Sequence, residues 1–234
     1  MMKKWSFIYK QGLAQNEATR GNYPMWGTCL GFEMMMFHTS NKTIKTSEPD
    51  SINQLWNLKF IPENFNQSRF KDVLRPEIVN YLENDRVSYF SHHFGFRLSA
   101  FEENKLLTES FFPVAYYTKQ GKKYVSIVQH KKYPIIGVQF HPEKILFEHK
   151  ERLNIKLTLP GSIASQEMSR VLFAPTLSNL NMFENQLLLN HFLLENFSTV
   201  KTFSVFESLY VFEESYFKSK NLYYVPSNKV PINF

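Results

Sequence analysis

The sequence contains a single cysteine among its 234 residues. One thiol excludes an internal disulfide framework and any metal site built from several cysteines, although it leaves an oxidising compartment open. The chain also lacks a long apolar run, because segments such as 186–194 are too short and too interrupted to span a bilayer. The N-terminus starts with basic residues but has no sustained apolar core, so we expect no signal peptide within this sequence.

A stripe of positive charge is absent as well. The net charge is +6, but the basic residues are scattered, and Lys122-Lys123 and Lys131-Lys132 are only short pairs. This distribution does not predict a nucleic-acid partner, whereas a small anionic substrate is compatible with it. The length and the apolar share of 43% predict one domain over residues 1–234, with a core at 3–200 and an aromatic C-terminal extension at 201–234.

The periodicity of apolar residues changes along the chain from helical to strand-like. The predicted helices cover residues 3–20, 30–38, 76–82 and 180–196. The predicted strands cover residues 23–28, 87–91, 112–118, 124–129, 135–140 and 208–212. We expect a hairpin turn at 120–121, a helical turn around 52–58 and a long loop over 148–178. This order of elements indicates an α/β layered sheet.

The only cysteine lies between two glycines, in the sequence Gly-Thr-Cys-Leu-Gly at residues 27–31. The stretch before it is apolar and aromatic, as in a buried strand, and the stretch after it is typical of a helix. A strand, a sharp glycine-flanked turn and a helix start form a nucleophile elbow, whose glycines avoid crowding and whose helix amides favour a thiolate. Cys29 is therefore a candidate nucleophile, although the spacing alone is equally compatible with a buried structural cysteine.

A second group of reactive residue types follows the predicted strand at 135–140. His141 stands at its end and Glu143 lies two residues further on, so in extended geometry both side chains point the same way. This arrangement suits a general base, His141, and a carboxylate that orients it, Glu143. A lone histidine at a strand end is more often structural, but the cysteine elbow upstream favours the catalytic interpretation.

These segments resemble a known family. The sequences Tyr-Pro-Met-Trp-Gly-Thr-Cys-Leu-Gly-Phe-Glu at 23–33 and Tyr-Pro-Ile-Ile-Gly-Val-Gln-Phe-His-Pro-Glu-Lys at 133–144 resemble the class I glutamine amidotransferase superfamily, and within it the γ-glutamyl hydrolases. The sequence Ser-His-His-Phe-Gly-Phe at 91–96 is similar to a family stretch whose first histidine lines the substrate site, and His92 matches that position. The resemblance implies a three-layer, flavodoxin-like α/β sheet with helices on both faces.

The resemblance also implies an activity, namely a cysteine peptidase that removes γ-linked glutamates from folate polyglutamates. Cys29 would attack the γ-amide carbonyl and form a thioester, the amide of Leu30 would stabilise the oxyanion, and His141 would protonate the leaving amine. No metal and no organic cofactor are expected. The implied compartment is the lysosome, the vacuole or the cell exterior.

The chain departs from the family pattern at its N-terminus, where relatives carry strands and a glycine loop before the helix that here starts at residue 3. We therefore expect the strand at 23–28 to expose an edge, which a second copy of the chain or another partner would cover. We also expect one oxyanion donor to be missing, which typically costs about 10²–10³ in rate.

Two alternatives to an active hydrolase remain open at this point. One is an impaired or truncated protein that serves as a structural or interaction subunit, as the missing strands suggest. The other is the glutaminase unit of an amidotransferase, which Trp26 and the pair Phe32-Glu33 disfavour.

Overall fold

The computed structural model describes residues 2–148, 151–201 and 208–211, and the chain divides into two compact units, Met1–Asn179 and Leu180–Phe234. Each unit is described by itself. The boundary at residue 179 lies within the expected core of 3–200, and the single-domain assignment stays a prediction.

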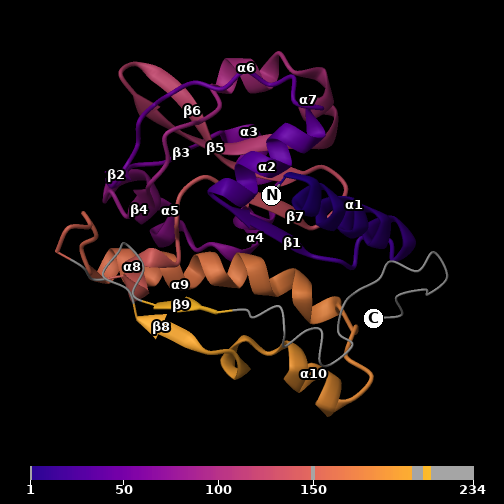
Figure 1. The fold of residues 1–234 in the computed structure, drawn as a ribbon. Coiled ribbons are helices and arrows are strands. Elements are labelled where there is room, and N and C mark those ends of the chain that lie inside the picture. Colours follow the sequence, from indigo (N-terminus) through magenta and orange to yellow (C-terminus); the bar gives the residue numbers. More distant parts are fainter. Residues whose placement is uncertain (1, 149–150, 202–207, 212–234) are drawn as a thin grey trace. The chain divides into compact units, whose positions relative to one another are not determined.

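The centre of the first unit is a five-stranded sheet with the strand order β1-β7-β6-β5-β3 (Figure 1). Its strands are β1 (Met25–Thr28), β3 (Lys59–Phe60), β5 (Phe111–Lys119), β6 (Lys122–His130) and β7 (Ile135–Val138). The pair β1–β7 is parallel and the other pairs are antiparallel. Within the described residues β1 is an edge strand, as the sequence predicted, and the parallel pair brings the C-terminal ends of β1 and β7 together.

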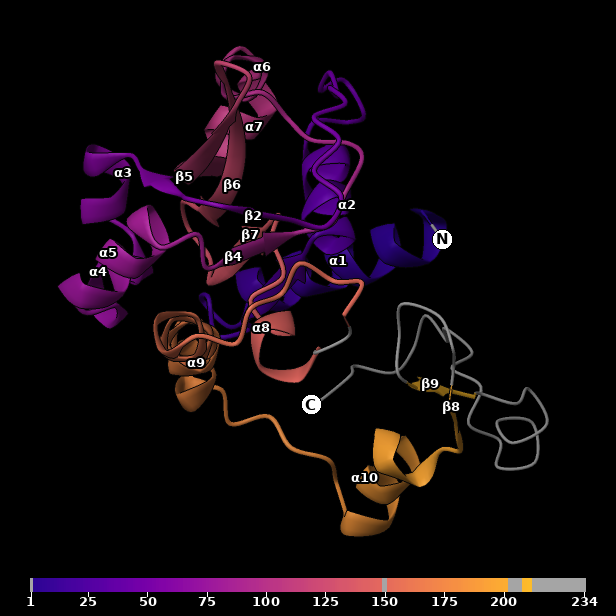
Figure 2. The same ribbon diagram turned by 90° about the vertical axis from the view of Figure 1, so that its left-hand side faces the viewer.

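Helices cover both faces of this sheet, which confirms the expected three-layer α/β class (Figure 2). One face packs against α1 (Met2–Ala18), α2 (Leu30–Thr39), α6 (Leu98–Glu102) and α7 (Lys105–Ser110). The other face packs against α4 (Arg69–Val73), α5 (Pro76–Asn84) and α9 (Leu159–Phe173). Ile135 and Ile136 of β7 show the alternation that produces two cores, because each belongs to a different apolar cluster.

Smaller elements complete the first unit. The strands β2 (Gln54–Trp56) and β4 (Ser88–Phe90) pair with each other, and the short helices are α3 (Pro62–Asn66), α8 (Lys144–Phe147) and η1 (Ala174–Ser178). The predicted hairpin turn is confirmed, since Gln120 and Gly121 join β5 to β6 with positive φ angles of 50° and 71°. Two residues with φ above zero are typical of the tight turns that fit strand twist.

Two sequence expectations for this unit are wrong. Residues 148–178 are not a long loop, because α9 occupies Leu159–Phe173; the Thr158 side chain accepts a hydrogen bond from the Gly161 amide at 3.2 Å and caps its start. Residues 52–58 do not form a helical turn, because β2 pairs with β4 there instead. In both places tertiary packing selects the structure, and short apolar spacing does not determine it.

The second unit contains α10 (Gln186–Phe192), η2 (Leu194–Asn196), β8 (Thr199–Lys201) and β9 (Ser208–Tyr210). The predicted helix at 180–196 is wrong in extent, since residues 179–185 have no regular structure and Asn185 caps α10. The predicted strand at 208–212 is found as β9. Residue 212 of that prediction lies outside the described residues, as does most of the expected extension at 201–234. Among the described helices we find none with the length and apolar character of a bilayer-spanning segment.

Candidate active site

Cys29 occupies the sharp turn between β1 and α2. Its backbone has φ 51° and ψ −105°, a strained conformation for a residue with a side chain. The Cys29 amide donates to the Val138 carbonyl at 2.8 Å, and the Glu33 amide donates to the Cys29 carbonyl at 2.9 Å. These bonds fasten the turn to β7 on one side and to α2 on the other. The predicted strand, turn and helix start are confirmed.

The two glycines that flank this turn differ in what they make possible. A Cβ atom on Gly27 would lie 2.8 Å from the Gly31 carbonyl carbon and 2.9 Å from the Phe32 nitrogen, so only glycine fits between β1 and α2. A Cβ atom on Gly31 would meet no atom of the described structure within 4 Å. The expectation that both flanks are crowded is therefore right for Gly27 and wrong for Gly31.

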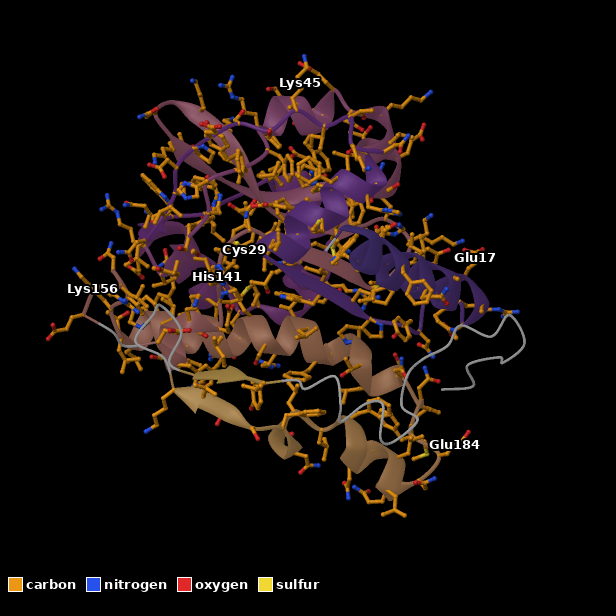
Figure 3. The ribbon with its side chains drawn as sticks, in the orientation of Figure 1. Glu17, Cys29, Lys45, His141, Lys156 and Glu184 are labelled. Atoms are coloured by element: carbon orange, nitrogen blue, oxygen red, sulfur yellow. The ribbon has the colours of Figure 1, made fainter. Side chains whose placement is uncertain are left out.

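His141 and Glu143 follow the end of β7 and form a hydrogen-bonded pair. The Nδ1 atom of His141 lies 2.7 Å from Oε1 of Glu143. Because a carboxylate only accepts, Nδ1 carries the hydrogen and Nε2 keeps its lone pair, as a general base requires. Since β1 and β7 are parallel neighbours, Cys29 and His141 leave the sheet at the same edge (Figure 3).

The sulfur of Cys29 is partly buried and has few polar neighbours. The Ser91 carbonyl oxygen lies 3.9 Å away and Nε2 of Gln139 lies 4.0 Å away. Within the described residues His141 forms no hydrogen bond with this sulfur, which is common where no substrate is bound. Burial, followed by the negative charge of Glu33, raises the pKa of the Cys29 thiol to about 11, while the Leu30 amide and Gln139 act in the opposite direction. The resting group is thus a thiol.

His92 lies just beyond β4 and is almost completely buried. Its Nδ1 atom donates to the Phe94 carbonyl at 2.5 Å, so Nε2 is the unprotonated nitrogen. That nitrogen is buried and has no hydrogen-bond partner among the described residues. Burial, with a smaller contribution from the nearby His141, lowers the pKa of His92 to about 4, although the hydrogen bond to the Phe94 carbonyl acts in the opposite direction. His92 is therefore a neutral acceptor close to His141.

Two buried polar residues beside Cys29 escaped the sequence analysis. Glu33 follows the cysteine by one helical turn on α2, and Gln139 lies directly after β7 and two residues before His141. Oε1 of Glu33 accepts a hydrogen bond from Nε2 of Gln139 at 3.1 Å. The i+4 spacing from Cys29 is a helical signal that could have identified Glu33. Strand spacing could not have identified Gln139, because the strand predicted at 135–140 ends at Val138.

An apolar cavity of about 440 Å³ adjoins the pair His141–Glu143. Its walls come from the edge strand β1, the turn before α8, α8 itself and the helix α9, and they include Trp26, Thr28, Glu143, Leu146 and Met168. Among the described residues no group of three or more His, Cys, Asp or Glu side chains is arranged to hold a metal ion.

Comparison with known proteins identifies the class to which this fold and turn belong. The family described as glutamine amidotransferase class-I matches residues 9–157, and the chain belongs to that family. A solved glutamine amidotransferase from Thermotoga maritima is 14% identical with a TM-score of 0.42, and the alignment covers 74% of this chain and 71% of that chain.

Among curated proteins, the chain is similar to γ-glutamyl hydrolases. It is 32% identical over 170 residues to "Gamma-glutamyl hydrolase" of Rattus norvegicus, covering 70% of this chain and 51% of the relative. It is 35% identical over 143 residues to "Gamma-glutamyl hydrolase 2" of Arabidopsis thaliana, covering 60% of this chain and 41% of the relative. The chain thus spans about half the length of the curated relatives it matches.

Proposed function

We propose that this chain is a cysteine hydrolase that cleaves the γ-glutamyl bonds of folate polyglutamates. The observation that carries the proposal is the strained turn at Cys29 beside the hydrogen-bonded pair His141–Glu143. The substrate class is taken from the relatives, whose names describe γ-glutamyl hydrolases. A net charge of +6 is compatible with a polyanionic substrate.

The proposed reaction begins when Nε2 of His141 removes the Cys29 thiol proton and the sulfur attacks the carbonyl carbon of the γ-amide. The carbonyl π bond opens to an oxyanion, which collapses as the C–N bond breaks. His141 then transfers the proton to the departing amine, leaving a thioester on Cys29. Water, deprotonated by His141, attacks the thioester, and the carboxylic acid and the thiol are released.

Glu143 and Leu30 have supporting roles in this scheme. The carboxylate of Glu143 holds His141 in the tautomer with a free Nε2 and stabilises its protonated form. The Leu30 backbone amide lies directly after the nucleophile, at the start of α2. Because its hydrogen bond to the Cys29 sulfur shows that it faces the reacting atom, it is the candidate oxyanion donor. The N-terminal helix dipole at this point also favours negative charge.

His92 is proposed to bind substrate. Its buried Nε2 is an acceptor without a partner among the described residues, and an unsatisfied buried acceptor is costly until a donor arrives. An N–H group of the substrate supplies such a donor. Because the pKa of His92 is lowered to about 4, the acceptor remains available throughout the neutral range.

The test compares the wild-type protein with Cys29→Ser on two substrates, a folate polyglutamate and free glutamine. We expect the wild type to release glutamate from the polyglutamate and little ammonia from glutamine, and we expect Cys29→Ser to release neither. Cys29-dependent ammonia release would instead indicate a glutaminase. Absence of both activities in the folded wild type would support the remaining alternative, an impaired protein that serves as a structural or interaction subunit. No comparison favours that alternative.

The exposed edge of β1 leads to a proposal about assembly. We infer that a second copy or another polypeptide covers this edge and the apolar cavity beside it, because exposed edges promote strand pairing. Sedimentation of the purified chain tests for a dimer.

A lysosomal, vacuolar or secreted location is proposed from the resemblance alone, and fluorescence imaging of the tagged protein tests it.

A further inference from the structure

The amide side chain of Gln139 lies between the Glu33 carboxyl group and the Cys29 sulfur. Its Nε2 atom is 3.1 Å from Oε1 of Glu33 and 4.0 Å from Sγ of Cys29. An amide nitrogen carries two hydrogens in fixed directions, so one can point to the carboxylate while the other points towards the sulfur. The three residues come from α2, the turn before it and the bend that follows β7.

Both polar side chains of this group are withdrawn from solvent. Gln139 has no exposed surface and Glu33 is 8% exposed. The Gln139 backbone is fixed as well, because its amide donates to the Ser126 carbonyl at 2.8 Å. Among the described residues the Oε1 atom of Gln139 is buried without a partner. Burying a carboxyl and an amide next to a thiol is unfavourable for stability, which points to a role at the site.

We propose that Glu33 and Gln139 are positioning residues that set the reactivity of Cys29. Gln139 presents an N–H group to the sulfur, where it stabilises the thiolate that forms during the reaction. Glu33 holds this amide in place and, through its own negative charge, keeps the resting sulfur protonated. The inference rests on the proposed function, because it assigns these residues a role at the nucleophile of that reaction.

Charges from every neighbouring element bear on Cys29. Glu33 faces it from α2 and Glu143 from the turn before α8, and both raise the pKa of the thiol. The Gln139 amide and the Leu30 amide lower it. Two imidazoles, His141 after β7 and His92 after β4, lie at the same edge of the fold, and burial keeps His92 neutral. The effects of Glu33 and Gln139 on the sulfur are therefore opposite in sign.

The opposite signs provide the test, and the single cysteine makes it selective. The rate of alkylation by iodoacetamide is measured against pH for the wild type, Glu33→Gln and Gln139→Met. Glu33→Gln removes a charge but keeps an acceptor, so we expect faster alkylation at pH 7.5. Gln139→Met removes the N–H donor at equal length, so we expect slower alkylation. Each change should be about three- to tenfold, as a pKa change of half to one unit produces.

Two controls separate this role from general loosening of the fold. Glu63→Gln, on the exposed side of α3, removes the same charge elsewhere and should leave the rate unchanged. Near-ultraviolet circular dichroism checks that each variant is folded. If Gln139→Met does not fold, Glu33→Gln decides for the effect of the carboxylate, and unchanged or slower alkylation in that folded variant overturns the proposal.

Several outcomes would overturn the inference. They are unchanged rates in both folded variants, a shift of both in the same direction, or a wild-type midpoint at or below that of a free thiol. Alkylation does not require turnover, so the result is independent of the hydrolysis assay. Opposite shifts without any Cys29-dependent hydrolysis would uphold this inference and refute the proposed function, and hydrolysis without the shifts would do the reverse.

Discussion

The histidines at positions 92 and 141 are oriented in the same way but are suited to different tasks. Each donates a hydrogen from Nδ1, to the Phe94 carbonyl or to the Glu143 carboxylate, and each leaves Nε2 unprotonated. Burial disfavours the charged form of His92, although its hydrogen bond to the Phe94 carbonyl acts in the opposite direction. The His141 side chain is 16% exposed and has a carboxylate as its partner. Burial thus makes His92 an acceptor, and the carboxylate partner is the feature that supports the proposal of His141 as the base.

Replacing Glu143 tests this assignment. Glu143→Gln keeps an acceptor for Nδ1 of His141 but removes the negative charge that stabilises the protonated ring. The Glu143 side chain is 53% exposed, so water screens part of its effect, and we expect kcat to fall by roughly tenfold, less than the loss of the acid–base group itself would cost. Steady-state kinetics on a folate polyglutamate measure the change. Glu109→Gln on α7 is the matched surface control, and equal kcat values for all three proteins would contradict the role.

His130 offers a prediction about stability that is separate from the site. Its Nδ1 atom accepts hydrogen bonds from the amides of Lys132 and Tyr133, both at 3.0 Å, in the turn between β6 and β7. Burial lowers the pKa of His130 to about 4. The unfolded chain binds a proton at this residue near pH 6.5 but the native chain only near pH 4, so falling pH in that range favours unfolding.

We therefore expect His130→Asn to make the free energy of unfolding less dependent on pH between 6.5 and 4. Asparagine can retain the acceptor without titrating, and the gain at pH 4 should be on the order of 1–2 kcal/mol, allowing for partial exposure of the ring. His130→Leu loses the acceptor and should be less stable throughout. Urea unfolding at several pH values measures both effects. An unchanged slope in His130→Asn would show that this residue is not responsible.

At this scale the sequence predicted features that are local and missed contacts that depend on packing. The turn at Cys29 follows from its flanking glycines, and the hydrogen bond between His141 and Glu143 joins residues two positions apart, although Glu143 has a helical conformation and not the expected extended one. The contact between Glu33 and Gln139 was not predictable, since its hydrogen bond spans 106 residues of sequence. A glutamate in an apolar helix gives no sign of its partner until β7 is placed beside β1.

Among the elements, β1 and α2 approach each other so closely at their junction that position 27 requires glycine. Gly27→Ala would place a methyl group 2.8 Å from the Gly31 carbonyl carbon, and backbone cannot yield as a flexible side chain can. We expect a loss of about 1–3 kcal/mol in stability and displacement of Cys29. Gly31→Ala, inside α2 with open space around it, should be neutral or stabilising by up to about 1 kcal/mol.

Thermal unfolding and the alkylation rate of Cys29 measure these two effects together. The comparison isolates the close approach of strand and helix, because both variants add the same methyl group within the same motif. Equal stability of the two variants would contradict the packing argument.

Element prediction failed where no local pattern distinguished the alternatives. The helix α9 begins with a proline and a glycine in its first turn, which look like a loop, although the Thr158 cap and the proline at this point are typical helix-start signals. The reverse error occurred at 180–196, where apolar spacing predicted a continuous helix. There Leu180 and Met182 are 88% and 77% exposed, so no packing maintains the helix that their spacing allows.

For the whole molecule, the parallel pair β1–β7 determines where the site forms. It brings residues 25–28 beside residues 135–138, and the intervening chain supplies the rest of the sheet and most of the helices. The α/β class was predictable from the order of elements, but this pairing was not. The strands β3, β5, β6 and β7 lie side by side in the order of the sequence, whereas β1 pairs with the last of them along the chain.

The division of the chain into two units can be tested by proteolysis. Two hydrogen bonds fix the C-terminal end of the first unit. The Asn179 side chain donates to the Asn22 carbonyl at 2.6 Å, and the Asn22 side chain donates to the Ser178 carbonyl at 3.0 Å. Residues 180–185 that follow have no regular structure, and Leu180 is 88% exposed. Backbone of this kind is a preferred site of proteolysis.

We expect brief chymotrypsin digestion to cut first between residues 180 and 183 and to leave a folded fragment ending near residue 180. Another irregular segment, around 151–158, is held more firmly, since Asn53 donates to the Arg152 carbonyl at 2.9 Å and accepts from the Asn154 amide at 2.5 Å. Mass spectrometry locates the cut, and circular dichroism with a thermal ramp shows whether the fragment unfolds cooperatively. A first cut within 151–158 would contradict the expected boundary near residue 180. A fragment without a thermal transition would favour the single domain over residues 1–234 that composition predicts, because the two units would then depend on each other for stability.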